Sequence, residues 1–179
     1  LLAALRMQNH NYINILLHHG ANPNFEHVSS ETRSAPLTSA VEEESAACVE
    51  ALLKGGADAN GCNAERGKPL TEATITGQRH VVRLLLAHGA DPDGSSYHRP
   101  LHSAVSHRDE SMFRLLLEAG ADIRTKDEAN RTLLHIWCLG GELPLSDSLC
   151  EASSIANVLL DAIAELSATD ETRSTAFIM

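Results

Sequence analysis

The chain has 179 residues, of which 43% are hydrophobic and only 3% aromatic, so its composition argues against a core built around large aromatic side chains. Its 24 acidic residues outnumber the 14 Lys and Arg, and the net charge of −10 argues against nucleic acid or an anionic membrane as the main partner. The apolar runs are shorter than the roughly 20 residues of a membrane span, no secretory leader is recognisable, and the four cysteines show no tight pairing. We therefore expect a protein of the cytoplasm or nucleus whose partner is another protein or a peptide.

A closing pattern recurs four times along the chain. A Leu-Leu pair precedes a Gly-Ala pair, and the glycines are Gly20, Gly56, Gly89 and Gly120. These glycines lie 36, 33 and 31 residues apart. Glycine suits the end of a helix because it adopts positive φ without a Cβ clash. The pattern predicts a second helix that closes near each glycine.

An opening pattern lies 15 residues before three of the Leu-Leu pairs. It begins at Pro36, Pro69 and Pro100, each followed by leucine, and Thr132-Leu133-Leu134-His135 stands in its place further on. Proline suits the first turn of a helix, where its missing N–H would have had no partner. The spacing from the opening leucine to the Leu-Leu pair therefore fits two short antiparallel helices in each unit.

Together these landmarks resemble the ankyrin repeat family, whose units open with Thr-Pro-Leu-His and close with Gly-Ala. The resemblance covers essentially the whole chain and implies an all-α solenoid of paired antiparallel helices with short β-hairpin loops. We expect a single domain over residues 1–179 with these approximate units: 1–24 (partial), 25–60, 61–93, 94–124, 125–170 with an insertion near 141–150, and 171–179 as the start of a further unit.

Some positions depart from the family pattern. Ala35, Lys68 and Arg99 stand where the family has threonine, so three units should lack a capping hydroxyl, at a cost of about 1 kcal/mol each. Residues 141–150 form an insertion that we expect to leave the fold as a loop. That loop is either a tolerated surface insertion or a partner-specific contact.

Both ends of the sequence fall inside repeats and carry apolar residues. An ankyrin unit buries its apolar face only against neighbouring units, and natural arrays close with polar caps. We therefore expect the chain to be part of a longer protein, with self-association through exposed terminal repeats as a further expectation.

The ten histidines prompt the question of a metal or catalytic site. The sequence has no paired metal-ligand motif, phosphate-binding loop or catalytic signature, so we expect no metal, no cofactor, no catalytic residues and no enzyme activity. His102 and His135 occupy the opening-motif position, where the resemblance implies a structural hydrogen bond to neighbouring backbone. An enzyme or ligand-binding protein that uses a groove containing His98 and His107 is the alternative.

The resemblance also indicates a binding surface, since first helices of the family line a concave groove and hairpins project beside it. The expected contacts are Phe25, Glu42, Glu43, Ile75, Tyr97, Arg99 and His107. Exposed aromatic side chains often anchor interfaces, but Phe25 and Tyr97 would equally serve to pack their hairpins. We predict a non-catalytic protein-interaction module, with a regulatory or targeting region of a multidomain protein as the other reading.

Overall fold

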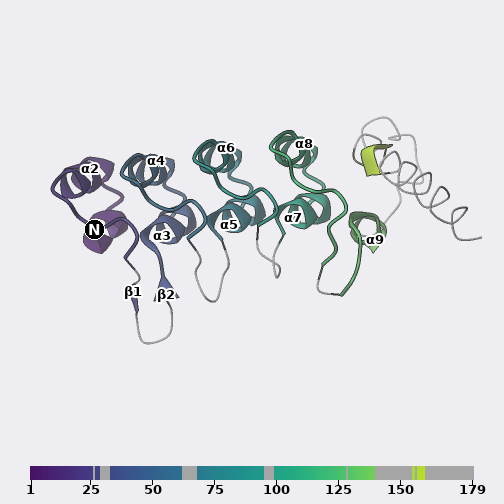
Figure 1. The fold of residues 1–179 in the computed structure, drawn as a ribbon, viewed down its shortest axis with the longest axis horizontal. Coiled ribbons are helices and arrows are strands. Elements are labelled where there is room, and N and C mark those ends of the chain that lie inside the picture. The colour runs from purple at the N-terminus through teal and green to yellow at the C-terminus, as the bar shows by residue number, and fades with distance from the viewer. Residues whose placement is uncertain are drawn as a thin grey trace, which may run out of the picture.

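In the computed structural model the chain forms a linear stack of helix pairs (Figure 1). The structure describes residues 1–25, 27–28, 33–61, 68–94, 99–127, 129–139, 155 and 157–159. The elements in chain order are α1 (Leu2–Arg6), α2 (His10–His18), β1 (His27–Val28), β2 (Arg33–Ser34), α3 (Pro36–Glu42), α4 (Ala46–Lys54), α5 (Pro69–Ile75), α6 (Arg79–Ala87), α7 (Pro100–Ser106), α8 (Glu110–Glu118) and α9 (Leu133–Leu139).

The helices form two rows. First helices α1, α3, α5, α7 and α9 lie side by side in one row, and second helices α2, α4, α6 and α8 form the other (Figure 1). In the connection between α2 and α3, β1 and β2 project from the first-helix side as an antiparallel hairpin in which His27 pairs with Ser34. We call each pair a unit, so that α1–α2 is unit 1, α7–α8 is unit 4 and α9 opens unit 5.

Each first helix is short and opens at the predicted place. Proline occupies the first position of α3, α5 and α7. The side chains of the preceding residues, Ala35, Lys68 and Arg99, make no capping hydrogen bond, as the missing threonine hydroxyls predict. These helices are therefore stabilised by packing rather than by their ends.

The core follows the helical period of both rows. In α3 the buried residues Leu37, Ala40 and Val41 face the neighbouring helices, and the alanine lets them approach closely. The second helices bury Leu52, Leu85 and Leu116 at one shared position. Burying such a side chain contributes about 1.5–3 kcal/mol, so the stack is held mainly by these layers.

The Gly-Ala landmark closes each second helix as predicted. In unit 2 the N–H of Ala57 donates to the carbonyl of Leu52 (2.9 Å) and the N–H of Gly56 donates to that of Leu53 (3.1 Å). This pair of bonds requires a left-handed residue at the glycine, and Gly56 has φ of 86°. Units 1, 3 and 4 repeat the arrangement at Gly20, Gly89 and Gly120.

A ladder of side-chain to backbone hydrogen bonds joins successive units. Asn60 Nδ2 donates to the carbonyl of Gly89 (2.8 Å), and Asn60 Oδ1 accepts from the N–H of Asp91 (2.8 Å). Asn24 makes the same two bonds to unit 2, at 3.1 and 2.7 Å. At the third step Asp93 accepts from the N–H of Asp122 (2.8 Å), but a carboxylate cannot donate in return. We call this series the Asn/Asp ladder; it joins each unit to the next.

Candidate functional site

The first helices α1, α3, α5 and α7 each present two exposed residues at their last turn. These pairs are Arg6 and Met7, Glu42 and Glu43, Ile75 and Thr76, and Ser106 and His107. We call these eight residues the first-helix row. Because the same two register positions repeat in neighbouring helices, the pairs are arranged one after another along the stack.

The row includes four of the seven residues that the sequence singled out. Glu42 ends α3 and Glu43 follows it, both exposed. The side chain of Ile75 is 39% exposed although it is a large apolar residue. His107 follows α7 and is exposed as well.

Hydrogen bonds hold several members of the row in place. His107 Nδ1 donates to the carbonyl of Ser103 (2.8 Å), which leaves Nε2 as the acceptor of the neutral ring. The hydroxyl of Thr76 donates to the carbonyl of Glu72 (2.9 Å) and accepts from Gln78 Nε2 (2.8 Å). These two side chains are thus fixed to their own helices, which lowers the entropy cost of binding against them.

Beyond His107 the surface continues onto a pair that the sequence analysis did not identify. The guanidinium of Arg108 lies 4.7 Å from the centre of the Trp137 ring, a cation–π contact between unit 4 and α9. Trp137 stands where other units have alanine. The large side chain at this position was the one feature of the sequence that could have indicated the contact. This pair makes the unit 4 end of the surface both basic and aromatic.

The three hairpin candidates have different outcomes. Phe25 is half-buried beside the ladder residue Asn24, and Tyr97 lies outside the described residues. Arg99 is half-buried before α7, and its Nε is buried without a hydrogen-bond acceptor among the described residues. Their contact with a partner stays a prediction.

Among the described residues, the structural hydrogen bond expected of His102 is not found. In unit 5 the Thr132 hydroxyl donates to His135 Nδ1 (2.7 Å), which is the local pair that the opening motif provides. In unit 4 Arg99 replaces that threonine, and no described residue makes a hydrogen bond of normal geometry to either ring nitrogen of His102. Burial, and then the charge of Arg99, lower the pKa of His102 more than Asp127 and the backbone of Arg131 raise it. His102 is therefore a buried neutral histidine.

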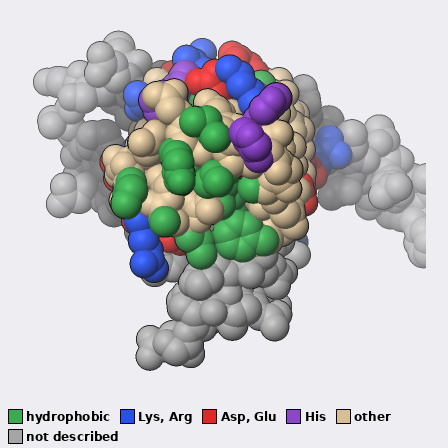
Figure 2. All heavy atoms as spheres, turned by 90° about the vertical axis from the view of Figure 1, so that its left-hand side faces the viewer, with side chains coloured by type: hydrophobic (Ala, Val, Ile, Leu, Met, Phe, Trp, Pro, Cys, Tyr) green, Lys and Arg blue, Asp and Glu red, His purple; other side chains and the backbone are tan. Residues whose placement is uncertain are grey.

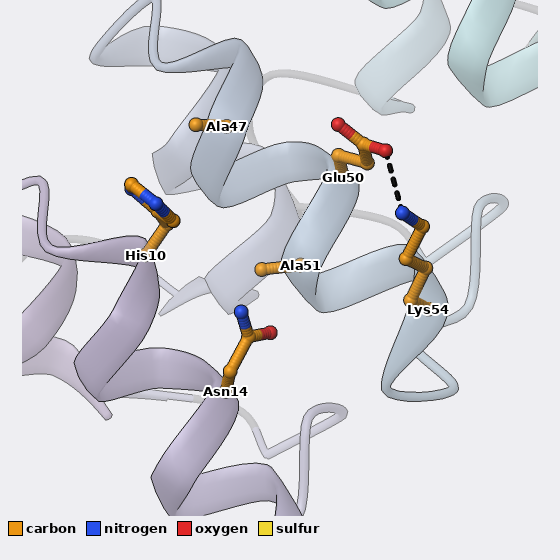
Figure 3. A pocket seen from close by; sticks show the side chains of 6 residues that line it. All are labelled: His10, Asn14, Ala47, Glu50, Ala51 and Lys54. Atoms are coloured by element: carbon orange, nitrogen blue, oxygen red, sulfur yellow. Dashed lines mark hydrogen bonds and ion pairs between the residues drawn. The ribbon is translucent and has the colours of Figure 1, made fainter.

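A separate hollow of about 250 Å³ lies between the second helices α2 and α4 (Figure 3). It exists because Ala51 stands where other second helices carry Ile15, Leu84 and Leu115. Its rim charges pair with each other, since Lys54 Nζ lies 2.7 Å from Glu50 Oε1. With its charges paired, the hollow is a weaker candidate than the first-helix row.

The end of the stack formed by α1 and α2 is apolar (Figure 2). Hydrophobic side chains gather there with histidines at one edge, and Tyr12 and Ile15 of α2 are each 53% exposed. In later units the position of Tyr12 is occupied by Cys48, Val81 and Met112, which the preceding unit buries. The expected self-association through terminal repeats stays a prediction.

Two searches of the described residues bear on other classes of site. No group of three or more His, Cys, Asp or Glu among them is placed to hold a metal ion. No described helix is both long and apolar enough to cross a membrane.

The comparison with protein families agrees with the architecture. The family model described as ankyrin repeats (3 copies) matches residues 37–127, which are 91 of the 179 residues. The matched range begins at the opening leucine of α3 and extends through α8 to the hairpin before α9. The landmarks, the two rows of helices and this match together show that the chain belongs to the ankyrin repeat family.

Proposed function

We propose that this chain is a non-catalytic interaction module that binds a protein or peptide along the first-helix row and the adjoining hairpins. Ankyrin repeats are generally protein-interaction modules. The observation that carries the proposal here is the row itself, in which eight exposed side chains of varied chemistry repeat at two register positions. Specific recognition needs such a chemically varied surface.

The row fits binding better than it fits catalysis. A catalytic site needs a nucleophile or an acid–base pair within hydrogen-bond reach, held in a concave site. The row instead spreads its polar groups over four helices, and its one histidine bonds to its own helix. We extend the proposed contacts to Phe25, Tyr97 and Arg99, because the hairpin of β1 and β2 projects from the first-helix side of the stack and the family resemblance implies a corresponding hairpin before α7. The absence of tight cysteine pairing supports a reducing compartment, the cytoplasm or nucleus.

The test is capture of the partner by the immobilised chain from an extract of cells that naturally make it, followed by mass spectrometry. The Ile75→Ala/His107→Ala variant should lose the captured protein, since both side chains belong to the row. The matched control is Arg83→Ala/Glu118→Ala, which changes exposed residues on second helices α6 and α8. If the control loses the protein and the row variant keeps it, the proposed surface is wrong.

A further inference from the structure

The Asn/Asp ladder contains the one Asn-Gly pair of the sequence. Asn60, which joins unit 2 to unit 3, is followed directly by Gly61. In such a pair the backbone nitrogen of the glycine can attack the side-chain carbonyl carbon of the asparagine. Glycine has no side chain to hinder this attack, whereas other residues slow it. Among the asparagines of the chain, Asn60 is therefore the one whose side-chain amide is chemically most prone to be lost.

The turn at the end of unit 2 explains why glycine occupies position 61. The N–H of Gly61 donates to the carbonyl of Asp58 (3.0 Å) and closes the turn. A Cβ added at Gly61 would lie 3.1 Å from that carbonyl oxygen, tighter than most contacts of a real Cβ. Unit 3 repeats the turn with Gly94, whose N–H donates to the carbonyl of Asp91 (3.0 Å). The fold thus favours the residue that makes Asn60 reactive.

The loss of this amide consumes two groups that the folded chain uses. The Gly61 nitrogen gives its proton to water and bonds to Cγ of Asn60, while Nδ2 takes up a proton and leaves as ammonia, which produces a succinimide ring. Water then opens the ring at either carbonyl and yields aspartate or isoaspartate. In the structure the Gly61 N–H donates to Asp58, and Asn60 Nδ2 donates to the carbonyl of Gly89 (2.8 Å). Both hydrogen bonds must break before ammonia leaves, so the stacked units oppose the reaction.

We propose that Asn60-Gly61 is a spontaneous modification site that is closed while units 2 and 3 are stacked and reacts when they separate. Separation of two neighbouring units needs less free energy than unfolding of the whole array, because each unit contacts only its neighbours. Hydrolysis of the succinimide does not restore the amide. A rare and reversible opening of this junction thereby becomes a permanent change in its ladder step.

The next step of the ladder shows what the aspartate product retains. Asp93 occupies the equivalent position and accepts from the N–H of Asp122 (2.8 Å), but a carboxylate cannot donate in return. Aspartate at position 60 would likewise keep the bond from Asp91 and lose the bond to Gly89. Isoaspartate also adds an atom to the main chain and so disturbs the turn. Both products weaken the junction, and the modified chain opens more readily than the original.

The chemistry is tested with the full chain unfolded in urea at neutral pH, followed by mass spectrometry of its tryptic peptides. We expect Asn60 to convert about tenfold faster than Asn24, which makes the same two ladder bonds but is followed by Phe25. Gly61→Ala should slow Asn60 to the rate of Asn24, and in urea the tight approach of the new Cβ has no influence. Equal conversion of Asn60 and Asn24 would show that the pair is not a reactive site.

The gate is tested in buffer without urea. Conversion of Asn60 should be at least about tenfold slower than in urea, since only the open fraction of chains reacts. Val81→Ala removes an α6 side chain that the preceding unit buries, and it should accelerate conversion in buffer about tenfold by weakening the junction. The matched control Val105→Ala makes the same change in unit 4 and should leave the rate close to that of wild type. Equal rates in buffer and urea, or equal acceleration by both variants, overturn the gating by this junction.

The effect on the stack is measured with aged protein. Anion exchange separates the chains that have gained a carboxylate, and mass spectrometry selects the fraction modified at Asn60. That fraction should unfold at a lower urea concentration than fresh protein, and Asn60→Asp serves as the reference for its aspartate part. A modified fraction as stable as fresh protein would overturn the weakening of the junction.

Discussion

A single replaced side chain gives His102 its unusual environment. The opening motif supplies a threonine hydroxyl to the following histidine, as Thr132 does for His135. At the same place in unit 4 the chain carries Arg99, and no described side chain donates to the ring of His102 as Thr132 does to that of His135. Burying a polar ring without hydrogen bonds is costly, and protonating it there costs more.

The pKa of His102 predicts a pH dependence of stability. Burial and Arg99 lower the folded pKa below the ordinary value, so the unfolded chain binds the proton at a higher pH than the folded chain. Stability should therefore be constant with respect to this group above about pH 6.5 and fall as the pH drops below it, by at most about 1.4 kcal/mol per pH unit. Urea unfolding of wild type and His102→Gln between pH 8 and 5 measures the difference, in which the other histidines cancel.

A second variant separates burial from charge in this prediction. Arg99→Thr removes the neighbouring cation, whose charge lowers the pKa of His102, so the pH dependence of the variant should be shallower than that of wild type. Parallel stability curves for wild type and His102→Gln across this range would show that His102 does not titrate with folding.

At the scale of the helix, α2 and α8 each begin with a side-chain cap. Asp109 accepts from the N–H of Met112 (3.0 Å) and caps α8, and Asn9 caps α2 in the same way through Tyr12. Asp109 also holds Arg79 of unit 3 through both carboxylate oxygens, each at 2.9 Å from Nη2. Partial burial acts to raise the pKa of Asp109, but the Met112 N–H and Arg79 together bring it below the usual value. One carboxylate thus ends a helix and joins two units.

The two roles of Asp109 can be measured separately. Asp109→Asn keeps the cap and loses the ion pair, and we expect a loss of about 0.5 kcal/mol because Arg79 is half exposed. Asp109→Ala loses the cap as well, for a total of about 1.5 kcal/mol. Asn9→Ala, which removes a cap without an ion pair, is the control in urea unfolding. Equal losses for the Asn and Ala variants would mean that the cap contributes nothing.

The sequence predicted the helix ends better than it predicted the turns between them. Gly56 and its equivalents have a visible reason, since they must take positive φ. Between the first and second helices the chain also turns through left-handed residues, but Gln8, Glu44 and Arg108 occupy that position with φ of 50–54°. None of these three residue types predicts a turn from the sequence. In unit 3 the equivalent residue is Gly77, which does predict one. Packing of the two helices overrides the local preference there.

The residues of the candidate site could be predicted where their position depends on the register of a single helix. They could not be predicted where their position depends on how neighbouring units pack. Glu42, Ile75 and His107 follow from their places at the ends of first helices. The contact of Arg108 with Trp137 depends on how α9 docks against α7, and the partners of Asn60 depend on the next unit. Neither can be read from a single repeat.

For the whole molecule, the Asn/Asp ladder predicts how the units are coupled. Asn60→Ala removes both bonds to unit 3, and we expect a loss of about 1–2 kcal/mol with a lower urea m-value if units 1–2 separate from the rest. Asn60→Asp keeps the acceptor and should lose less. The reverse change, Asp93→Asn, supplies the missing donor toward Gly120 and should stabilise by about 0.5–1 kcal/mol. An Asn60→Ala variant as stable as wild type would mean that the ladder contributes nothing to coupling.

The ladder also governs how such a protein can change its length. Each unit offers its neighbour the same groups, a carbonyl and an N–H on one side and an amide or carboxylate on the other. Suppose that residues 61–93 were duplicated directly after the original. The copy would donate a backbone N–H to Asp93, as Asp122 of unit 4 does now, and its own copy of Asp93 would accept from the next unit. The surface would grow by one helix spacing, about 8–10 Å. Gain or loss of a whole unit is thus tolerated by the geometry, whereas a fraction of a unit would leave the ladder groups out of register.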